Sequence, residues 1–223
     1  MLKIVETADG SKTIYNEEVD ELYHSRNGAL QESIHVFINA GLKYFLSQNM
    51  ATEAGILEVG FGTGLNFLLS AQHCSQNQIK LSYTGIEAYP LSPEMISQTG
   101  YGQYISPALW ESFIAAYPLS LKQAVDIDPL TQLTTAHHKL LEFTSAHLFD
   151  VIYFDAFASS KQPEMWTDEA ITQTINFLKP GGIFVTYAIT GNLKRLLKSL
   201  GLKIEKVPGA AGKREMLRGT NKF

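Results

Sequence analysis

The stretch Leu57–Phe67, read as Leu-Glu-Val-Gly-Phe-Gly-Thr-Gly-Leu-Asn-Phe, contains the features that decide the fold. The apolar residues from Ile56 to Val59 are typical of a short buried strand. Three glycines at alternate positions follow, and then an apolar run from Leu65 to about Ala71 predicts a helix. Glycines at a strand end let a ligand approach the backbone closely, and the first turn of the next helix offers free N–H groups. The stretch therefore predicts a ligand site at the carboxyl end of a strand.

The segments on either side repeat the order strand, loop, helix. Further strands are predicted at 81–88, 130–136, 149–154 and 183–189, and further helices at 163–178 and 192–200. Apolar strands that alternate with helices favour a parallel sheet covered on both faces. We expect an α/β fold with a Rossmann-like, doubly wound, mostly parallel sheet of seven strands. Residues 202–207 and 214–218 are expected to form an antiparallel hairpin at its edge.

The first 50 residues are expected to form an extension to this sheet. A hairpin is predicted from 2–6 and 12–15, around the turn Asp9-Gly10. A helix is predicted over 29–47, because apolar residues recur there at mostly three- and four-residue spacing. The chain has no repeat or Pro/Gly/Ser linker, so residues 1–223 are predicted to be one domain, with its ligand-binding core at 51–223.

Composition excludes several classes of protein. Of the 223 residues, 45% are hydrophobic and 18% are charged, which disfavours disorder and coiled coil. No apolar run approaches the ~18 residues of a membrane span, and Met1–Glu6 lacks the apolar core of a secretory signal. A single cysteine excludes an internal disulfide framework. We expect a soluble, cytoplasmic protein without a membrane partner.

The formal net charge of -4 hides an asymmetry along the chain. Residues 191–223 contain nine Lys or Arg against two acidic residues, which is half of all the positive charge. Two interpretations remain open, a basic face that binds a polyanion and a solvated helix with its hairpin.

Glu58 precedes the first glycine by two residues, which gives the pattern E-x-G-x-G-x-G. A dinucleotide-binding loop has the pattern G-x-G-x-x-G, and it is disfavoured here because Leu65 stands where its last glycine would be. With Glu87 at the end of the next strand, this pattern resembles class I S-adenosylmethionine methyltransferases. The resemblance implies that the glycines pass under the amino-acid part of S-adenosyl-L-methionine and that Glu87 accepts hydrogen bonds from the ribose hydroxyls. The implied cofactor-binding residues are Glu58, Gly60, Gly62, Gly64, Asn66, Glu87 and Asp155.

Three further segments, residues 23–37, 155–166 and 208–217, resemble the tRNA-modifying methyltransferase family of MnmC, in a stand-alone form. The resemblance implies N-methylation of 5-aminomethyl(-2-thio)uridine at the wobble position, in the anticodon region of tRNA. Upstream tRNA-modifying enzymes would then supply the aminomethyl precursor. Two residues depart from the family: Ser159 replaces a usual proline, and Lys139 stands where relatives often have an acid near the adenine.

Asp155, which leaves a buried strand at the expected site, is the predicted catalytic residue. A primary alkylamine is mostly protonated at pH 7 and must become neutral before it attacks a methyl carbon. Asp155 is expected to hold this amine and orient its lone pair, although a carboxylate with an ordinary pKa of ~3.9 is a weak base. Binding of the ammonium group of the cofactor is an equal alternative.

Aromatic and basic residues are the candidates for substrate binding, because flipped bases stack on aromatic rings and phosphates pair with cations. The candidates are Phe157, Trp166 and Tyr187 for the base, and Lys161, Lys194, Arg195, Lys213 and Arg214 for phosphates.

Two other functions remain open. A methyltransferase for a small-molecule amine or carboxylate would share the glycine loop, Glu87 and Asp155 without needing a basic C-terminus. A non-catalytic module that binds S-adenosylmethionine would not need Asp155. No metal is predicted, because His137 and His138 are adjacent on an expected strand and would point to opposite faces. His24 and His35 are interpreted as structural.

Overall fold

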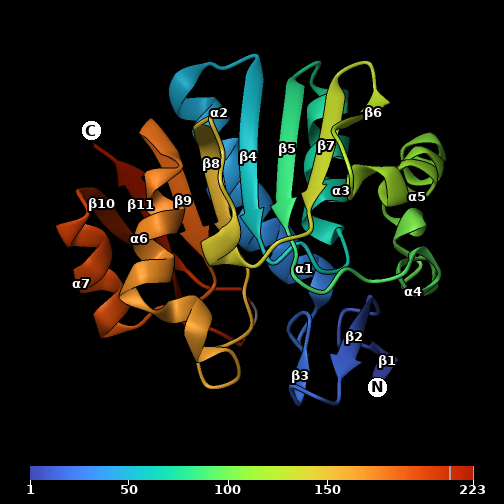
Figure 1. The fold of residues 1–223 in the computed structure, drawn as a ribbon, viewed down its shortest axis with the longest axis horizontal. Coiled ribbons are helices and arrows are strands. Elements are labelled where there is room, and N and C mark those ends of the chain that lie inside the picture. Colours follow the sequence, from blue (N-terminus) through green and yellow to red (C-terminus); the bar gives the residue numbers. More distant parts are fainter. Residues whose placement is uncertain (211, 223) are drawn as a thin grey trace.

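The computed structural model describes residues 1–210 and 212–222, and its central feature is an eight-stranded sheet (Figure 1). The strand order is β10-β11-β9-β8-β4-β5-β7-β6. The five central strands are parallel: β9 (Leu178–Thr186), β8 (Phe149–Phe154), β4 (Glu53–Val59), β5 (Lys80–Ile86) and β7 (Thr131–Ala136). Strands β10 (Leu202–Pro208) and β11 (Glu215–Asn221) form an antiparallel hairpin, and β11 pairs antiparallel with β9. These observations confirm the predicted α/β sheet with its antiparallel edge hairpin. Ala211, within the segment 208–217, lies outside the described residues.

The expected count of seven strands is wrong by one. Strand β6 (Val125–Asp128) pairs antiparallel with β7 and adds an eighth strand at the second edge. A strand of four residues is too short to give a clear alternating pattern, and this one ends directly at the turn into β7. The sheet is therefore mixed at both edges and parallel in its centre.

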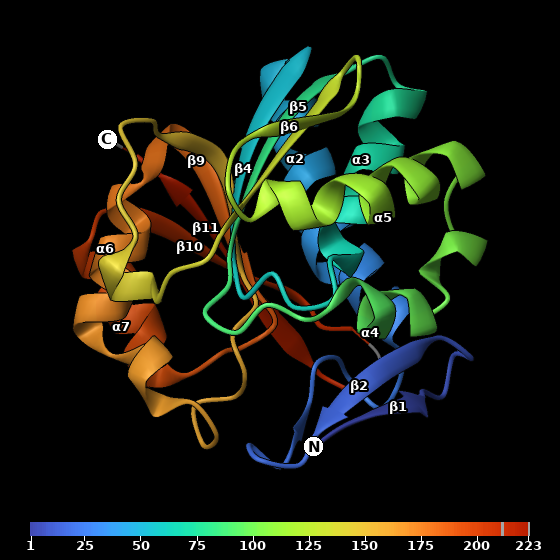
Figure 2. The same cartoon turned by 45° about the vertical axis from the view of Figure 1, so that its right-hand side comes forward.

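Helices cover both faces of the sheet (Figures 1 and 2). One face carries a continuous helical segment and α3, and the other carries α6 and α7; α4 and α5 follow β5. Their bounds are α1 (Ala29–Ser33), the π-helix η1 (Ile34–Lys43), α2 (Tyr44–Asn49), α3 (Leu65–Gln76), α4 (Pro93–Gln98), α5 (Pro107–Ser120), α6 (Asp168–Asn176) and α7 (Gly191–Ser199). The predicted helix 29–47 is confirmed, and α4 and α5 had no counterpart among the predicted elements.

The predicted helix 163–178 and strand 183–189 are partly wrong. A 3-10 turn, η4 (Pro163–Trp166), comes first, and α6 starts only after Thr167, whose hydroxyl accepts the N–H of Ala170. Leu178 already belongs to β9, which ends at Thr186. The run Lys179–Gly182 lies between the predicted helix and the predicted strand, but in the structure β9 continues through it with a shift in register.

The first strands form a small separate sheet of β1 (Leu2–Glu6), β2 (Lys12–Asn16) and β3 (Glu21–Leu22), which confirms the predicted hairpin. It lies beyond the carboxyl ends of the parallel strands (Figures 1 and 2). Two short 3-10 turns, η2 (Tyr101–Gln103) and η3 (Leu140–Glu142), complete the structure. Among the residues described, no helix has both the length and the apolar character that crossing a membrane requires.

Parallel register sets the carboxyl ends of three strands at one level. Val59, the last residue of β4, is opposite Ile86 of β5 and Phe154 of β8. The residues that follow these strand ends are Gly60, Glu87 and Asp155, so the three predicted site residues emerge at the same edge of the sheet.

The glycine loop is fixed to the sheet by the side chain of Phe61, which is 2% exposed. The Phe61 ring lies directly over Gly85 in β5, where a Cβ atom would overlap it. Only glycine leaves room for this packing, so β5 and the loop are fitted to each other.

Gly85→Ala is expected to lower the free energy of unfolding by about 1–3 kcal/mol, because the added methyl group displaces a packed aromatic ring. Urea unfolding followed by circular dichroism measures the change. Ser82→Ala is the control, since Ser82 is an exposed residue of the same strand and its change should stay within about 0.5 kcal/mol. Equal losses in the two variants would contradict the proposed packing constraint.

Candidate active site

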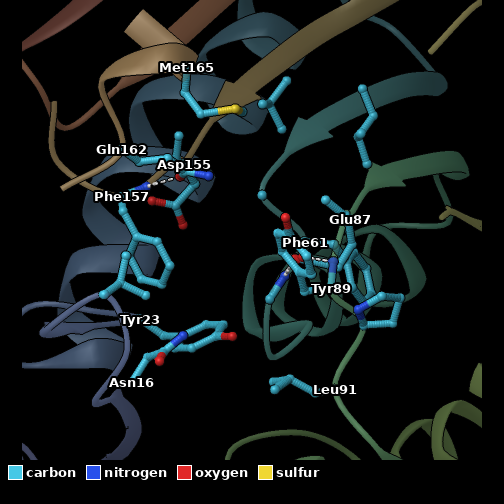
Figure 3. Close-up of a pocket in the computed structure, with 18 of the residues that line it drawn as sticks. Asn16, Tyr23, Phe61, Glu87, Tyr89, Leu91, Asp155, Phe157, Gln162 and Met165 are labelled. Atoms are coloured by element: carbon cyan, nitrogen blue, oxygen red, sulfur yellow. Dashed lines mark hydrogen bonds between the residues drawn. The ribbon is translucent and has the colours of Figure 1, made fainter. Parts of the chain in front are cut away.

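A cavity of about 960 Å³ opens at the carboxyl ends of β4, β5 and β8 (Figure 3). Its walls come from the glycine loop, the segments that follow β5, β7 and β8, and N-terminal residues that include Tyr23 and His24. Ligand cavities in proteins usually have volumes of roughly 300–1,000 Å³, so this one can hold a large ligand or two smaller ones.

Gly60 starts the loop in a conformation that requires glycine. Its φ is +88°, and a Cβ atom there would lie 2.6 Å from the backbone oxygen of Asp155. The N–H groups of Gly60 and Phe61 both donate to the carbonyl of Ile86 at 3.1 Å. The end of β4 is therefore held against both neighbouring strand ends. Gly62 also lines the cavity, and Gly64 directly precedes α3.

Glu87 faces the cavity from the side opposite Asp155 (Figure 3). Its Oε2 accepts the N–H of Gly62 at 2.8 Å, and its Oε1 accepts the N–H of Tyr89 at 2.9 Å. Two backbone donors thus fix the carboxylate, and each oxygen has a lone pair left for a ligand hydroxyl.

Asn66 joins two carboxyl groups on the other side of the cavity. Its Nδ2 donates to Oε1 of Glu58 at 2.8 Å and to Oδ2 of Asp155 at 2.9 Å. Glu58 is fully buried and also accepts the hydroxyl of Tyr83 at 2.7 Å. Glu58 is not among the residues that line the cavity, whereas Asn66 and Asp155 are. The predicted cofactor contact of Glu58 stays a prediction, and its observed position is that of a support for Asn66.

Burial makes both acids weaker. Desolvation, assisted by the nearby Asp155, raises the pKa of Glu58 well above its usual range. Burial and the charge of Glu32 raise the pKa of Asp155 to about 8, against the opposing effects of Asn66 and Lys213. Asp155 is therefore poised near neutral pH, where the sequence alone suggested a weak base.

The predicted base-binding aromatics differ in position. Phe157 lines the cavity and makes an edge contact with Tyr23, with ring centroids 5.1 Å apart (Figure 3). Trp166 lies behind it, packed on Phe154, and donates its Nε1–H to the carbonyl of Phe157 at 2.8 Å. Tyr187 donates its hydroxyl to the carbonyl of Ala156 at 2.8 Å. Only Phe157 of the three predicted rings is in the cavity wall.

The predicted phosphate-binding cations are also not brought together. Lys161 lines the cavity and pairs with Asp20 at 2.7 Å. Lys213 is half-buried and pairs with Glu32, and Arg214 beside it is exposed. Lys194 and Arg195 belong to α7, away from the cavity wall.

Sequence reasoning missed Glu32, Tyr23 and Tyr83 as parts of the site. Glu32 and Tyr23 lie within the segment 23–37, whose family resemblance was the signal that they have a function. Tyr83 is one of the alternating buried residues of β5, and this pattern gave no signal beyond packing.

The histidines were only partly understood from the sequence. His137 and His138 follow β7, which ends at Ala136, so the expectation that both belong to a strand is wrong. His24 lines the cavity and is hydrogen-bonded to the Thr13 hydroxyl, and His35 is hydrogen-bonded to the Pro208 carbonyl. The structural interpretation of both stays a prediction. In the part of the chain that the structure describes, no three His, Cys, Asp or Glu residues are grouped to hold a metal ion.

Comparison with known proteins bears on this site. Residues 106–222 match the sequence profile of a family described as S-adenosyl-L-methionine-dependent methyltransferase. The tRNA 5-methylaminomethyl-2-thiouridine biosynthesis bifunctional protein MnmC of Pseudomonas fluorescens is 33% identical over 221 residues, covering 90% of this chain and 32% of that protein. MnmC of Methylobacillus flagellatus is 32% identical over 222 residues, with coverages of 92% and 33%. The chain thus spans about a third of the length of these relatives.

Solved structures show the same fold. The crystal structure of MNMC2 from Aquifex aeolicus matches with a TM-score of 0.78 and 22% identity, covering 98% of this chain and 70% of that one. The N-methyltransferase NodS from Bradyrhizobium japonicum matches with a TM-score of 0.50 and 19% identity, covering 82% and 92%. These matches confirm the predicted Rossmann-like fold.

The residues present fit the cofactor that this family uses. Oδ1 of Asn66 is buried and has no hydrogen-bond partner among the described residues, which suits a donor such as the ammonium group of S-adenosyl-L-methionine. Glu87 offers acceptors for ribose hydroxyls on the opposite side, next to the loop that starts at Gly60. The acceptors thus correspond to the donors of this molecule.

Glu87→Gln is expected to weaken binding of S-adenosyl-L-methionine about 10–100-fold, because hydrogen bonds to a charged group contribute ~1.5–3 kcal/mol. Isothermal titration calorimetry measures the affinity. Glu94→Gln is the control, since Glu94 is exposed on α4 and does not line the cavity. An unchanged affinity in Glu87→Gln would limit the role of Glu87 to holding the loop.

Asp155→Asn is expected to raise the free energy of unfolding at pH 8. The pKa of Asp155 is raised to about 8, above the ordinary value of the unfolded chain, so the folded state loses stability as pH rises from about 4 to 8. Asparagine does not ionise and so does not suffer this loss. The free energy of unfolding of Asp155→Asn should therefore exceed that of the wild type by an amount that grows with pH to about 1 kcal/mol or more. Urea unfolding at several pH values measures it.

Asp150→Asn is the matched control, at an acidic residue of β8, the strand that Asp155 follows. Asp150 pairs with Lys179 at 2.9 Å and accepts the N–H of Gly55 at 2.7 Å, so this change should lower stability. If Asp155→Asn gave no gain at pH 8 relative to pH 5, the assigned pKa of Asp155 would be wrong.

Proposed function

This chain belongs to the family of S-adenosyl-L-methionine-dependent methyltransferases, and we propose that it N-methylates the 5-aminomethyl group of a (2-thio)uridine at the tRNA wobble position. The similarity over 90% of the chain to proteins named for 5-methylaminomethyl-2-thiouridine biosynthesis in tRNA supports this substrate. The observation that carries the proposal is Asp155, a carboxyl group on the cavity wall whose pKa lies near neutrality. The proposed partners are tRNA and the enzymes that make its aminomethyl precursor.

Asp155 is the proposed proton acceptor. The aminomethyl group arrives as an ammonium, and the ionised Asp155 takes one of its protons, which gives a neutral amine and a neutral carboxylic acid. Because the pKa of Asp155 is about 8, this transfer is much less unfavourable than it is to an ordinary carboxylate. Asn66 holds the carboxyl group at 2.9 Å and keeps it facing the cavity.

S-adenosyl-L-methionine supplies the methyl group as an electrophile on a sulfonium. The residues proposed to hold this cofactor are Gly60, Gly62, Asn66 and Glu87. Glu58 supports Asn66 by accepting a hydrogen bond from its amide. The methylated nitrogen leaves as an ammonium, and Asp155 returns its proton to water.

The target base is proposed to bind against Phe157, which lies on the wall next to Asp155 (Figure 3). Flipped bases are commonly held by aromatic rings, and the edge contact with Tyr23 fixes the orientation of Phe157. Arg214, which is exposed, remains the candidate phosphate contact at the C-terminal hairpin.

The test is methyl transfer from labelled S-adenosyl-L-methionine to tRNA that carries aminomethyluridine, followed by nucleoside mass spectrometry. A gain of one methyl on that nucleoside is expected. Asp155→Ala should reduce the rate about 10²–10⁴-fold, the usual contribution of a general base. Asp126→Ala, at an exposed carboxylate of edge strand β6, is the control and should retain activity.

Absence of transfer to this tRNA by protein that still binds the cofactor would refute the proposed substrate. Methylation of free alkylamines or carboxylates under the same conditions would then identify a small-molecule enzyme.

A further inference from the structure

An ion pair next to the proposed active site links helix α1, near the N-terminus, to the C-terminal hairpin. Nζ of Lys213, in the loop between β10 and β11, lies 2.7 Å from Oε2 of Glu32 in α1. Glu32 is 7% exposed, and its Oε1 accepts the N–H of Ser25 at 3.1 Å. The pair is therefore a buried carboxylate with a half-buried ammonium, in contrast to the more exposed pair of Lys206 and Glu215 on the same hairpin.

Aromatic packing connects this pair to the Asp155 segment. Nζ of Lys213 lies 4.0 Å from the centre of the Tyr187 ring, and the Tyr187 hydroxyl donates to the carbonyl of Ala156, the residue after Asp155. Neither Glu32 nor Lys213 lines the cavity. Both charges thus act on Asp155 from behind the cavity wall, where water screens them little.

This placement does not suit Lys213 as a phosphate ligand. To reach a phosphate, its ammonium group would have to leave Glu32 unpaired and buried, and breaking such a pair is costly. The neighbouring Arg214 is exposed and carries no such constraint.

The charges around Asp155 oppose one another. Glu32 favours the protonated form of Asp155, and Lys213 favours the ionised form. The titratable or charged groups that face Asp155 from the surrounding elements are Glu32 of α1, Glu58 of β4, Tyr83 of β5, Glu87 across the cavity, Tyr187 after β9 and Lys213. Lys213 is the cation that acts on Asp155 in this set, whereas Lys161, which lines the cavity, is paired with Asp20. Removal of Lys213 therefore takes away the charge that opposes Glu32.

We infer that the Glu32–Lys213 ion pair sets how readily Asp155 exchanges its proton, and that both are positioning residues for the proposed amine methylation. This inference rests on the proposed function. Glu32 keeps Asp155 basic enough to accept a proton from the substrate ammonium, and Lys213 keeps it acidic enough to release that proton to water after transfer. No further reactant is needed, because only the proton of the substrate moves.

The test follows the titration of the Asp155 carboxyl carbon by ¹³C NMR in the protein without substrate, with Asp155→Asn assigning the signal. Lys213→Met keeps the packing on Tyr187 and should move the midpoint to higher pH by about half to one unit. Glu32→Gln keeps the acceptor for Ser25 and should move it to lower pH by a similar amount. The double variant should return close to the wild-type midpoint.

The pH profile of methyl transfer supplies the second readout. Its acid limb should move in the same direction as the NMR midpoint in each variant, and Lys213→Arg should restore the wild-type position. The matched control is the exposed pair of Lys206 and Glu215 on the same hairpin, 3.1 Å apart. Lys206→Met and Glu215→Gln should leave both midpoints unchanged.

Two results would overturn the inference. One is a shift in the same direction, or no shift, in Lys213→Met and Glu32→Gln. The other is a loss of tRNA affinity in Lys213→Met with an unmoved Asp155 midpoint, which would make Lys213 a phosphate ligand. Because the NMR titration needs no substrate, failure of tRNA methylation leaves this test intact and counts only against the proposed function.

Discussion

One amide group holds the site together. Asn66 divides the two hydrogens of its Nδ2 between Glu58 and Asp155, and so keeps two weakened acids close to each other at the ends of adjacent strands. Without these donors, two carboxyl groups would share a dry environment with no hydrogen bond between them. Among the described residues, the oxygen of this amide has no hydrogen-bond partner, and it is an acceptor that the structure offers to a ligand ammonium. A single side chain thus supports the fold and presents the ligand site.

The sheet supplies the remaining geometry. Because β5, β4 and β8 are parallel and in register, Glu87, Gly60 and Asp155 emerge at one level without any long loop to place them. Backbone donors then fix the Glu87 carboxylate, and the packing of Phe61 on Gly85 fixes the loop. The Glu87 carboxylate is therefore positioned by the main chain, whereas the Asp155 carboxyl on the other side of the cavity is held by the Asn66 side chain.

The local sequence predicted the site residues that directly follow strands. It did not predict the contacts between segments that are far apart in the chain. The glycines, Glu87 and Asp155 were predicted because each follows an apolar run that ends at the same edge. Glu58 has the spacing of a cofactor residue, yet it does not line the cavity, and its two oxygens accept hydrogen bonds from Asn66 and Tyr83. Lys213 was predicted to meet phosphate because its cluster is basic. Its partner Glu32 lies 181 positions earlier in the chain, and no periodicity relates the two. Strand β6 was missed because four residues give too little pattern.

The order of the strands has a consequence for synthesis of the protein. Strands β4 and β5 leave the ribosome before β8, together with the glycine loop and Glu87. Strand β5 ends at Ile86, whereas β8, which pairs with the other side of β4, starts only at Phe149. A nascent chain that ends before β8 has one wall of the cavity and lacks Asp155, and Asn66 has Glu58 as its one acid partner. Cofactor binding is therefore expected to report that the chain has been translated past the segment that follows β8, since that segment forms the last wall of the pocket.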